Sequence, residues 1–270
     1  MANDESQPRV KDVWENGDAY GVFMGRWSRL IAVKFLEWLS VPAGSKWLDV
    51  GCGTGILSQT ILDVTDPVIV RGIDQASGFV SFAENHIRDP RASFEVGSAE
   101  FLPSESNIYD AAVSGLVLNF IPKGDQAVSE LKRVIKPGCV VAAYVWDYAD
   151  KMQLLRHFWD AAVLLDSEAA MLDEGKRFPL CNPEKLRELF AAQGLKSVEV
   201  KAIEVQTHFT DFEDYWSPFL SGQGPAPSYL ASLNKGQQSD LREQVRAHLP
   251  ISAHGTIDLV ARAWAVRGYS

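Results

Sequence analysis

The chain has 270 residues, of which 46% are hydrophobic and 23% charged, a composition typical of one large globular domain. Its formal net charge of −9 argues against a nucleic-acid partner, because an acidic chain does not build the positive field that tracks phosphates. No apolar run approaches the ~18 residues that span a bilayer, and three scattered cysteines form neither a disulfide framework nor a metal pair. We therefore expect a cytoplasmic protein without membrane insertion and without a metal, and leave its oligomeric state open.

Apolar and amphipathic segments alternate after a polar leader, residues 1–28, that lacks the apolar core of a signal peptide. Residues 30–39 place apolar side chains at helical spacing, and Pro42 and Gly44 end that helix. Short apolar runs further on are typical of buried strands, with amphipathic helices between them. The expected strands are 46–50, 68–73, 92–96, 111–114 and 139–146, and the expected helices are 56–64, 78–87 and 125–135.

This alternation predicts βαβ units and a parallel, doubly wound sheet. Such sheets bind ligands at the carboxyl ends of their strands, where the strand order reverses. The rhythm changes after Asp147: residues 151–165 read as a helix, and residues 197–205 and 256–266 as two more strands. We therefore expect one domain over 29–270, with cap elements at about 151–182 and 207–254.

The segment "LDVGCGTG" (Leu48–Gly55) places three glycines directly after the first expected strand. Glycine adopts positive φ and lets a ligand approach the backbone closely. The N–H groups of the turn and the positive end of the next helix suit an anionic group. The stretch is therefore predicted to cradle a ligand.

Two ligand classes compete for this turn. A dinucleotide requires G-x-G-x-x-G/A, and Ile56 stands at the third required position. Asp49 would also repel a pyrophosphate, whereas it suits an ammonium or a sulfonium group. The turn amides could then hold a carboxylate, so a nucleoside bearing an amino acid, such as S-adenosylmethionine, fits both features.

Five segments in chain order resemble the motifs of class I S-adenosylmethionine-dependent methyltransferases. They are "LDVGCGTG", Asp74 at the end of the second strand, "GSAEFLP" (97–103), "YDAAVSGLVLNFIP" (109–122) and "RVIKPGCVV" (133–141). The resemblance covers residues 25–147 and points to the quinone, sterol and natural-product branch. It implies a Rossmann-like fold with a seven-stranded sheet, mostly parallel with an antiparallel last strand, and a helical cap insertion.

The resemblance also implies which residues contact S-adenosylmethionine. Asp74 corresponds to the acid that bonds the ribose hydroxyls, and the N-terminal segment corresponds to a lid that brings Tyr20 and Arg26 near the cofactor carboxylate. Ser98 stands where many members carry Asp, so recognition of adenine there can shift to the backbone of Ala99. The remaining expected contacts are Asp49, Gly51, Cys52, Gly53, Gln75, Glu100, Ser114 and Gly115.

The acceptor side of the site is less defined by sequence. We expect a small, partly apolar acceptor, because the insertion mixes aromatic residues with Gly and Pro. Asp147 is a weak candidate for a general base. The candidates for acceptor contacts are Asn119, Trp146, Trp216, Phe219 and Gln223.

For most of these residues a structural role stays open beside the functional one. Asn119 can start a helix, Trp146 can pack in the core, and the aromatic residues of the N-terminal segment can clasp the sheet edge. Two alternatives to a methyltransferase also stay open: a non-catalytic scaffold or sensor that binds S-adenosylmethionine, and an NAD-dependent oxidoreductase.

Overall fold

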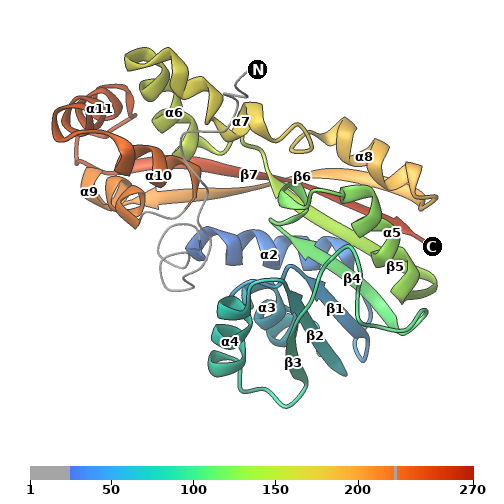
Figure 1. Cartoon of the computed structure of the whole chain (residues 1–270). Coiled ribbons are helices and arrows are strands. Elements are labelled where there is room, and N and C mark those ends of the chain that lie inside the picture. The colour runs from blue at the N-terminus through green and yellow to red at the C-terminus, as the bar shows by residue number, and fades with distance from the viewer. Residues whose placement is uncertain (1–24, 222–223) are drawn as a thin grey trace.

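The computed structural model describes residues 25–221 and 224–270, which form a seven-stranded sheet with the strand order β3-β2-β1-β4-β5-β7-β6 (Figure 1). The strands β1 to β5 are mutually parallel, and β7 runs antiparallel to both of its neighbours. The strands are β1 (Lys46–Val50), β2 (Ile69–Asp74), β3 (Ala92–Val96), β4 (Tyr109–Gly115), β5 (Ile135–Trp146), β6 (Lys196–Phe209) and β7 (Ile257–Tyr269). The expected doubly wound sheet with an antiparallel last strand is confirmed.

The strand order reverses at β1, which pairs with β2 on one side and with β4 on the other. Right-handed crossovers on the two sides of this point place their helices on opposite faces of the sheet. Accordingly α2 packs with α3, while α5 packs with α8. The loops after β1 and β4 therefore diverge and leave a crevice at the carboxyl ends of the strands.

The helices follow the amphipathic stretches of the sequence, and α3 has the bounds expected from its pattern. Residues Trp27, Ile31 and Phe35 form a buried stripe on the first described helix, α2, which therefore begins before the expected Leu30. The helices are α2 (Arg26–Leu39), α3 (Ile56–Val64), α4 (Ser77–His86), α5 (Gly124–Val134), α6 (Gln153–Leu165), α7 (Glu174–Arg177), α8 (Pro183–Ala192), α9 (Phe212–Trp216), α10 (Pro225–Ser232) and α11 (Lys235–His248), with short 3₁₀ turns η2 (Leu118–Phe120), η3 (Ser167–Met171) and η4 (Ser217–Ser221).

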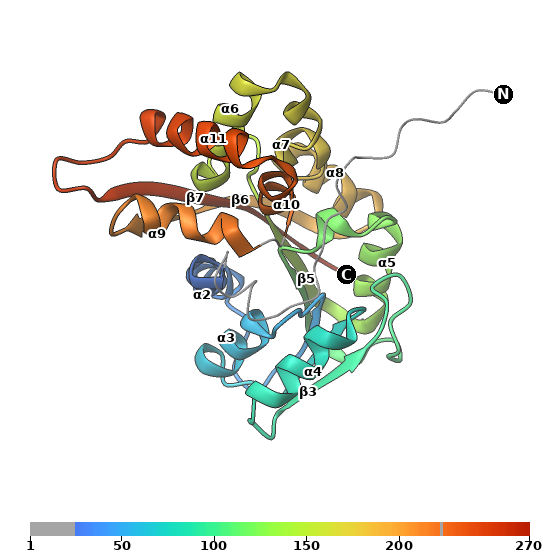
Figure 2. The same ribbon diagram turned by 60° about the vertical axis from the view of Figure 1, so that its left-hand side comes forward.

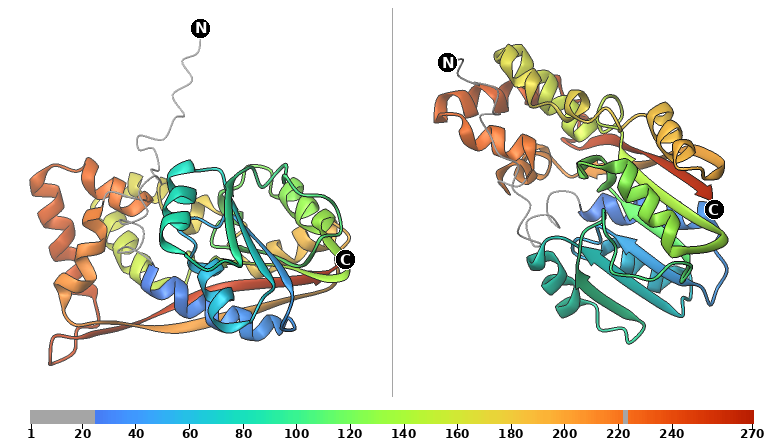
Figure 3. Two further views of the ribbon diagram at one scale, coloured as in Figure 1. Left: turned by 90° about the horizontal axis from the view of Figure 1, so that it is seen from below. Right: turned by 45° about the vertical axis from the view of Figure 1, so that its right-hand side comes forward.

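The β6–β7 pair is longer than the rest of the sheet. Its strands pair from Lys196 opposite Tyr269 to Phe209 opposite Ile257, whereas β5 pairs only with Ala263–Tyr269. The far half of the pair thus projects past the carboxyl ends of the parallel strands (Figure 3). Strand β6 continues past the expected end at Val205, because the alternation of buried residues extends to Phe209.

Helices gather around this projecting pair. Figure 2 shows α6 and α11 on one side of it and α2, α3 and α4 on the opposite side. Because β6 ends and β7 begins at the edge where the parallel strands also end, the segment between them lies over that edge. Residues 207–254 were expected to form cap elements, and the described part of this segment holds α9, η4, α10 and α11. None of the helices in the described residues is long and apolar enough to cross a membrane.

Candidate functional site

A cavity of about 230 Å3 lies at the carboxyl ends of the parallel strands, at the point where the strand order reverses. Its wall comes from the loops after β1 to β5 and from α2, α6, α7 and α10. The structure brings together on this wall most of the residues that the sequence predicts to contact a cofactor: Asp49, Gly51, Cys52, Gly53, Asp74, Gln75, Ser98, Ala99, Glu100 and Gly115.

The glycine turn between β1 and α3 forms the floor of the cavity. All three glycines have positive φ, and a Cβ on Gly51 or Gly55 would clash with the side chain of Val117 or Ile87, each at 2.5 Å. A Cβ on Gly53 would meet no atom within 4 Å, so at this position the turn leaves open space beside the cavity. The absence of a side chain at Gly53 thus makes room for a ligand.

The backbone N–H groups of the turn were expected to hold a ligand's carboxylate, but four of them donate hydrogen bonds within the protein. Gly51 and Cys52 donate to the carbonyl of Ile73 at 2.7 and 3.1 Å, and Gly55 donates to the carbonyl of Cys52 at 2.8 Å. The N–H of Gly53 donates to Asp74 Oδ2 at 2.9 Å. These four amides therefore stabilise the turn itself.

Asp49 lines the cavity and has one carboxylate oxygen without a hydrogen-bond partner in the described residues. Its side chain is buried, and Oδ2 accepts a hydrogen bond of 2.7 Å from the Ser58 hydroxyl, while Oδ1 has no partner in the described part of the chain. Burial raises the pKa of Asp49 to about 7, and the nearby Asp74 adds to this rise. A buried acceptor without a partner is destabilising unless a ligand satisfies it, and a cation satisfies it best.

Asp74 ends β2 and joins two loops. Besides the bond from Gly53, its Oδ1 accepts the backbone N–H of Ala76 at 2.9 Å. Burial raises the pKa of Asp74, and these backbone hydrogen bonds act in the opposite direction. Each oxygen keeps a lone pair for a hydroxyl donor.

The charged side chains on the wall all have one sign. Asp49, Asp74, Glu100 and Glu174 are the ionisable acids, and among the described lining residues there is no Lys, Arg or His. This composition favours a cationic ligand and opposes a pyrophosphate, in agreement with the reading of Asp49 from sequence. It therefore also weighs against the dinucleotide alternative.

Two other predicted cofactor contacts lie away from this wall. Arg26 pairs with Asp214 at 3.1 Å and its guanidinium lies over the rings of Trp27 and Phe209. The Ser114 hydroxyl is buried in β4 and has no partner within residues 25–221 and 224–270. Tyr20, predicted as a lid residue, and Gln223, predicted as an acceptor contact, lie outside the described residues.

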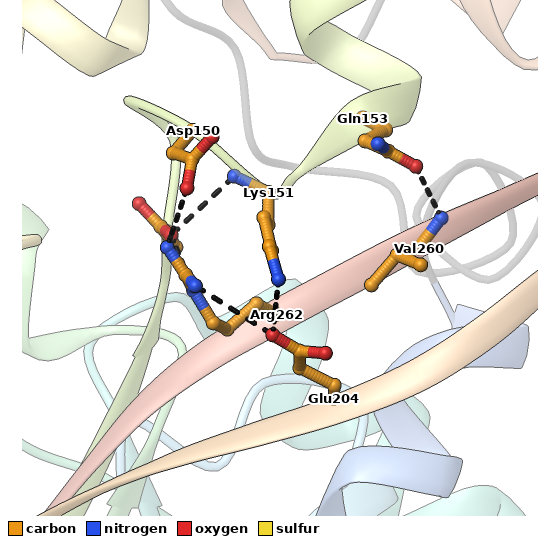
Figure 4. Close-up of polar contacts among 7 residues, drawn as sticks. Asp150, Lys151, Gln153, Glu204, Val260 and Arg262 are labelled. Carbon is orange, nitrogen blue, oxygen red and sulfur yellow. Dashed lines mark hydrogen bonds and ion pairs between the residues drawn. The ribbon is translucent and has the colours of Figure 1, made fainter.

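Asp147, the weak candidate for a general base, is bound to a neighbouring strand. Its Oδ2 accepts the Arg262 Nε–H at 2.6 Å, and both side chains are largely buried. Arg262 extends from β7 to Asp150 at 2.8 Å and to Glu204 at 3.6 Å (Figure 4). The structure thus gives Asp147 the role of tying the end of β5 to the β6–β7 pair.

The predicted acceptor contacts divide between the cavity and the core. Trp146 lies on the cavity wall. Trp216 and Phe219 instead pack with Phe158 of α6 in a buried aromatic cluster, with Phe219 stacked on Phe158 at a ring distance of 4.6 Å. Asn119 lies on η2 away from the wall, and its amide atoms are buried without a partner in the described residues.

Sequence reasoning missed several residues of the wall. Glu174, on the short helix α7, lines the cavity together with apolar side chains of other elements. The segment "DEGKR" that contains Glu174 reads as a polar loop, and no signal in it pointed to burial. The apolar neighbours that the sequence did not single out are Phe120, Tyr148, Leu155 and Pro225.

Comparison with known proteins connects this geometry to a family. Residues 48–143, which include the glycine turn and the ends of β1 to β4, match the family described as "Methyltransferase domain". This match, the relatives and the fold support a class I S-adenosylmethionine-dependent methyltransferase. The resemblance of its motifs to this family is thereby confirmed, S-adenosylmethionine is its cofactor, and the NAD-dependent alternative is set aside.

Relatives of this methyltransferase act in different pathways. A ubiquinone biosynthesis O-methyltransferase of Burkholderia thailandensis is 29% identical over 178 residues, which are 62% of this chain and 73% of that protein. A demethylmenaquinone methyltransferase of Lactobacillus johnsonii is 33% identical over 109 residues, or 38% of this chain and 45% of that one. The fold is shared with phosphoethanolamine N-methyltransferase 2 of Haemonchus contortus, with a TM-score of 0.60, 16% identity, and coverage of 94% of this chain and 56% of that chain.

The residues of the methyltransferase's cavity fit this cofactor. The unpartnered oxygen of Asp49 suits the ammonium of its methionine part, and the space at Gly53 admits it. Asp74 has acceptor capacity for ribose hydroxyls, and the segment Ser98–Glu100 lies where the resemblance places the adenine. When bound, the cofactor supplies a methyl group activated by a positively charged sulfur.

Proposed function

We propose that this methyltransferase transfers the methyl group to a small, partly apolar acceptor that carries no negative charge. The observation that supports this most directly is the composition of the cavity wall beyond the cofactor contacts. Apart from the acid Glu174, its side chains there include the apolar and aromatic Phe120, Trp146, Tyr148, Leu155 and Pro225. Such a wall favours a ring or an alkyl chain over a charged group.

The absence of cations on the described part of the wall bears on the charge of the acceptor. A carboxylate or phosphate on the acceptor would approach the acids Asp49 and Asp74 without a basic side chain on the described wall to compensate. A neutral or cationic acceptor avoids this repulsion. The net charge of −9 likewise disfavours a nucleic-acid acceptor.

The chain contributes to methyl transfer mainly by alignment. The sulfonium is already a good leaving group, so catalysis can rest on holding the acceptor's nucleophile in line with the methyl group. Leu155 of α6 and Pro225 of α10 add apolar side chains to the wall, and such side chains exclude water from the reacting atoms. Relatives named for ubiquinone, demethylmenaquinone and sterol methylation support an acceptor of this size and polarity.

A screen for methyl transfer tests the proposal. The full chain is incubated with S-adenosylmethionine and matched pairs of small aromatic hydroxyl and amine compounds, each pair with and without an added carboxylate, and release of S-adenosylhomocysteine is measured. We expect turnover with the uncharged member of at least one pair and at least tenfold less with its carboxylate analogue. Asp74→Asn serves as the control with impaired cofactor binding.

Two results would contradict the proposal. A preference for carboxylate analogues would refute the argument from the charge of the wall. Tight binding of S-adenosylmethionine without turnover on any compound would instead favour the alternative of a scaffold or sensor.

A further inference from the structure

Glu174 is a buried acid on the cavity wall that cofactor binding does not account for. Its exposed fraction is 2%, and it lines the cavity beside Tyr148 and Leu155. Its Oε2 accepts a hydrogen bond from the indole Nε1–H of Trp159. No basic side chain in the described ranges forms an ion pair with it, because the neighbouring cation, Arg156, pairs with Asp173 at 2.8 Å.

The structure around Glu174 holds it in this position. Arg156 and Trp159 lie on the same face of α6, one turn apart, and they bind Asp173 and Glu174 respectively. Asp173 also begins α7 by accepting the Gly175 N–H at 2.8 Å. The position of Glu174 is therefore specified by two contacts to one helix.

The close approach of α7 to the end of β5 requires a glycine beside Glu174. A Cβ on Gly175 would come within 2.9 Å of the Tyr148 carbonyl oxygen and 3.0 Å of the Ala149 Cα. Because this position has no side chain, α7 packs against the chain that follows Trp146. Glu174 thus enters the cavity from the same end of β5 that supplies Trp146 and Tyr148 to the wall.

The surroundings of Glu174 favour its neutral form in the protein alone. Burial raises its pKa to about 8, Asp173 adds to this rise, and Trp159 and Arg156 oppose it. Cys181, whose thiol pKa is raised by burial and by Asp147 and Glu174, is a further titratable group facing this site. A buried acid on a cavity wall with a pKa near neutral pH is typical of residues that transfer protons in active sites.

We propose that Glu174 is the general base of this enzyme and that the acceptor is a phenolic hydroxyl. The inference rests on the proposed function, since it assigns the nucleophile of the same acceptor. The acceptor O–H gives its proton to the ionised carboxylate of Glu174, a bond forms between that oxygen and the methyl carbon, and the methyl–sulfur bond breaks with its electron pair passing to sulfur. Glu174 then returns the proton to water.

A phenol suits this base better than an amine or an alcohol. A neutral amine attacks with its lone pair and loses a proton only after methylation. Its methylation therefore does not require Glu174 as a base. An alcohol is far too weak an acid, whereas a phenol with a pKa of about 10 lies close enough to this carboxyl for proton transfer. The aromatic rings of Phe120, Trp146 and Tyr148 give the phenol ring an apolar surface.

The experiment compares Glu174→Gln with the wild type, using 2-naphthol as the phenol probe and 2-naphthylamine as the amine. Gln keeps an oxygen for the Trp159 N–H but cannot accept the proton. We expect the rate with 2-naphthol to fall at least 100-fold, as is typical for loss of a general base, with the affinity for S-adenosylhomocysteine unchanged within about twofold. Glu168→Gln, at an exposed position on η3, is the matched control and should keep wild-type activity.

Two readouts separate a base from a structural residue. The wild-type rate with 2-naphthol should rise with pH and level off, whereas the Glu174→Gln rate should keep rising as free naphtholate accumulates. Trp159→Phe keeps the base but removes the hydrogen bond that favours its charged carboxyl. In this variant the rate with 2-naphthol should therefore rise at a higher pH than in the wild type.

Each result decides between the two proposals. If wild type and Glu174→Gln methylate 2-naphthol at the same rate and with the same pH profile, Glu174 is not the base, although the proposed function stands. If the wild type binds S-adenosylhomocysteine but methylates none of the uncharged compounds of the screen, the proposed function fails and the inference fails with it.

Discussion

Replacing Asp49 by Asn should make the protein more stable and its cofactor affinity weaker. Asn has the same shape, and its amide oxygen can still accept the Ser58 hydroxyl. It removes the charge that is buried beside the glycine turn, where Oδ1 has no partner in the described part of the chain. The two effects have opposite signs because the same charge is unfavourable in the empty cavity and favourable beside a cation.

The size of the stability effect follows from the pKa of Asp49. Its pKa is raised from 3.8 to about 7 by burial, and each unit corresponds to about 1.4 kcal/mol. A raised acid pKa means that the folded protein is favoured while the group is protonated. Stability therefore falls between about pH 4 and pH 7 and stays low above. At pH 8 the substitution should raise the free energy of unfolding by on the order of 4 kcal/mol, or Tm by roughly 10 °C.

The cofactor affinity should change in the other direction. Loss of one partner of a buried charge pair weakens binding by about 2–3 kcal/mol, which is roughly 30- to 150-fold in Kd. In the wild type only ionised Asp49 pairs with the ammonium, so affinity should weaken about tenfold for each pH unit below 7. In Asp49→Asn it should be flat between pH 6 and pH 8.

Calorimetric titration with S-adenosylhomocysteine and thermal unfolding, each from pH 6 to pH 8, measure both effects. Asp66→Asn is the matched control, because Asp66 is exposed and has a positive φ that Asn also adopts readily. Both its affinity and its Tm should stay near those of the wild type. A destabilised Asp49→Asn protein with unchanged affinity would refute the reasoning, since Asp49 would then serve the fold alone.

Three further substitutions test the remaining parts of the site. Gly53 and Gly44 share a positive φ and open space for a Cβ, so replacing either by Ala should lower stability by about 1 kcal/mol in chemical denaturation. Only Gly53→Ala should weaken S-adenosylhomocysteine binding in calorimetry. Equal affinities of the two variants would show that the space at Gly53 is not used. Asp147→Asn should lower stability by about 3 kcal/mol by leaving Arg262 without its partner, whereas an unchanged Tm with lost turnover would return Asp147 to the catalytic candidates. Asp74→Asn should weaken cofactor binding about 10- to 100-fold, since two backbone N–H groups and the cofactor depend on its oxygens, and an unchanged Kd would remove Asp74 from the site.

Much of the fold could be predicted because its signals are local. The bounds of β1, β3 and α3 agree with the apolar runs and helical spacing, which depend only on neighbouring residues. The glycine turn could be located for the same reason, since positive φ and close approach are properties of those residues. Asp49 and Asp74 could be placed at the site because each lies in or at the end of a strand whose partners run parallel.

The predictions were weaker where a residue's partner lies far along the chain. Trp216 and Phe219 have the composition of a pocket wall, yet they pack against Phe158 in the aromatic cluster. Asp147 directly follows a strand, a position where a general base is often found. In the structure it pairs with Arg262 from the last strand. In both cases the local pattern is compatible with two environments, and tertiary packing chooses between them.

The sequence by itself determined the strand-helix alternation, the glycine turn and the acids around it, and hence the family and its methyl donor. The wall proposed to contact the acceptor could be found only in the tertiary structure, because it is assembled from β5, α6, α7 and α10, which no local pattern connects. Glu174 shows this most clearly. Within "DEGKR" it is a polar residue among others, and its burial depends on Arg156, Trp159 and the close approach permitted by Gly175.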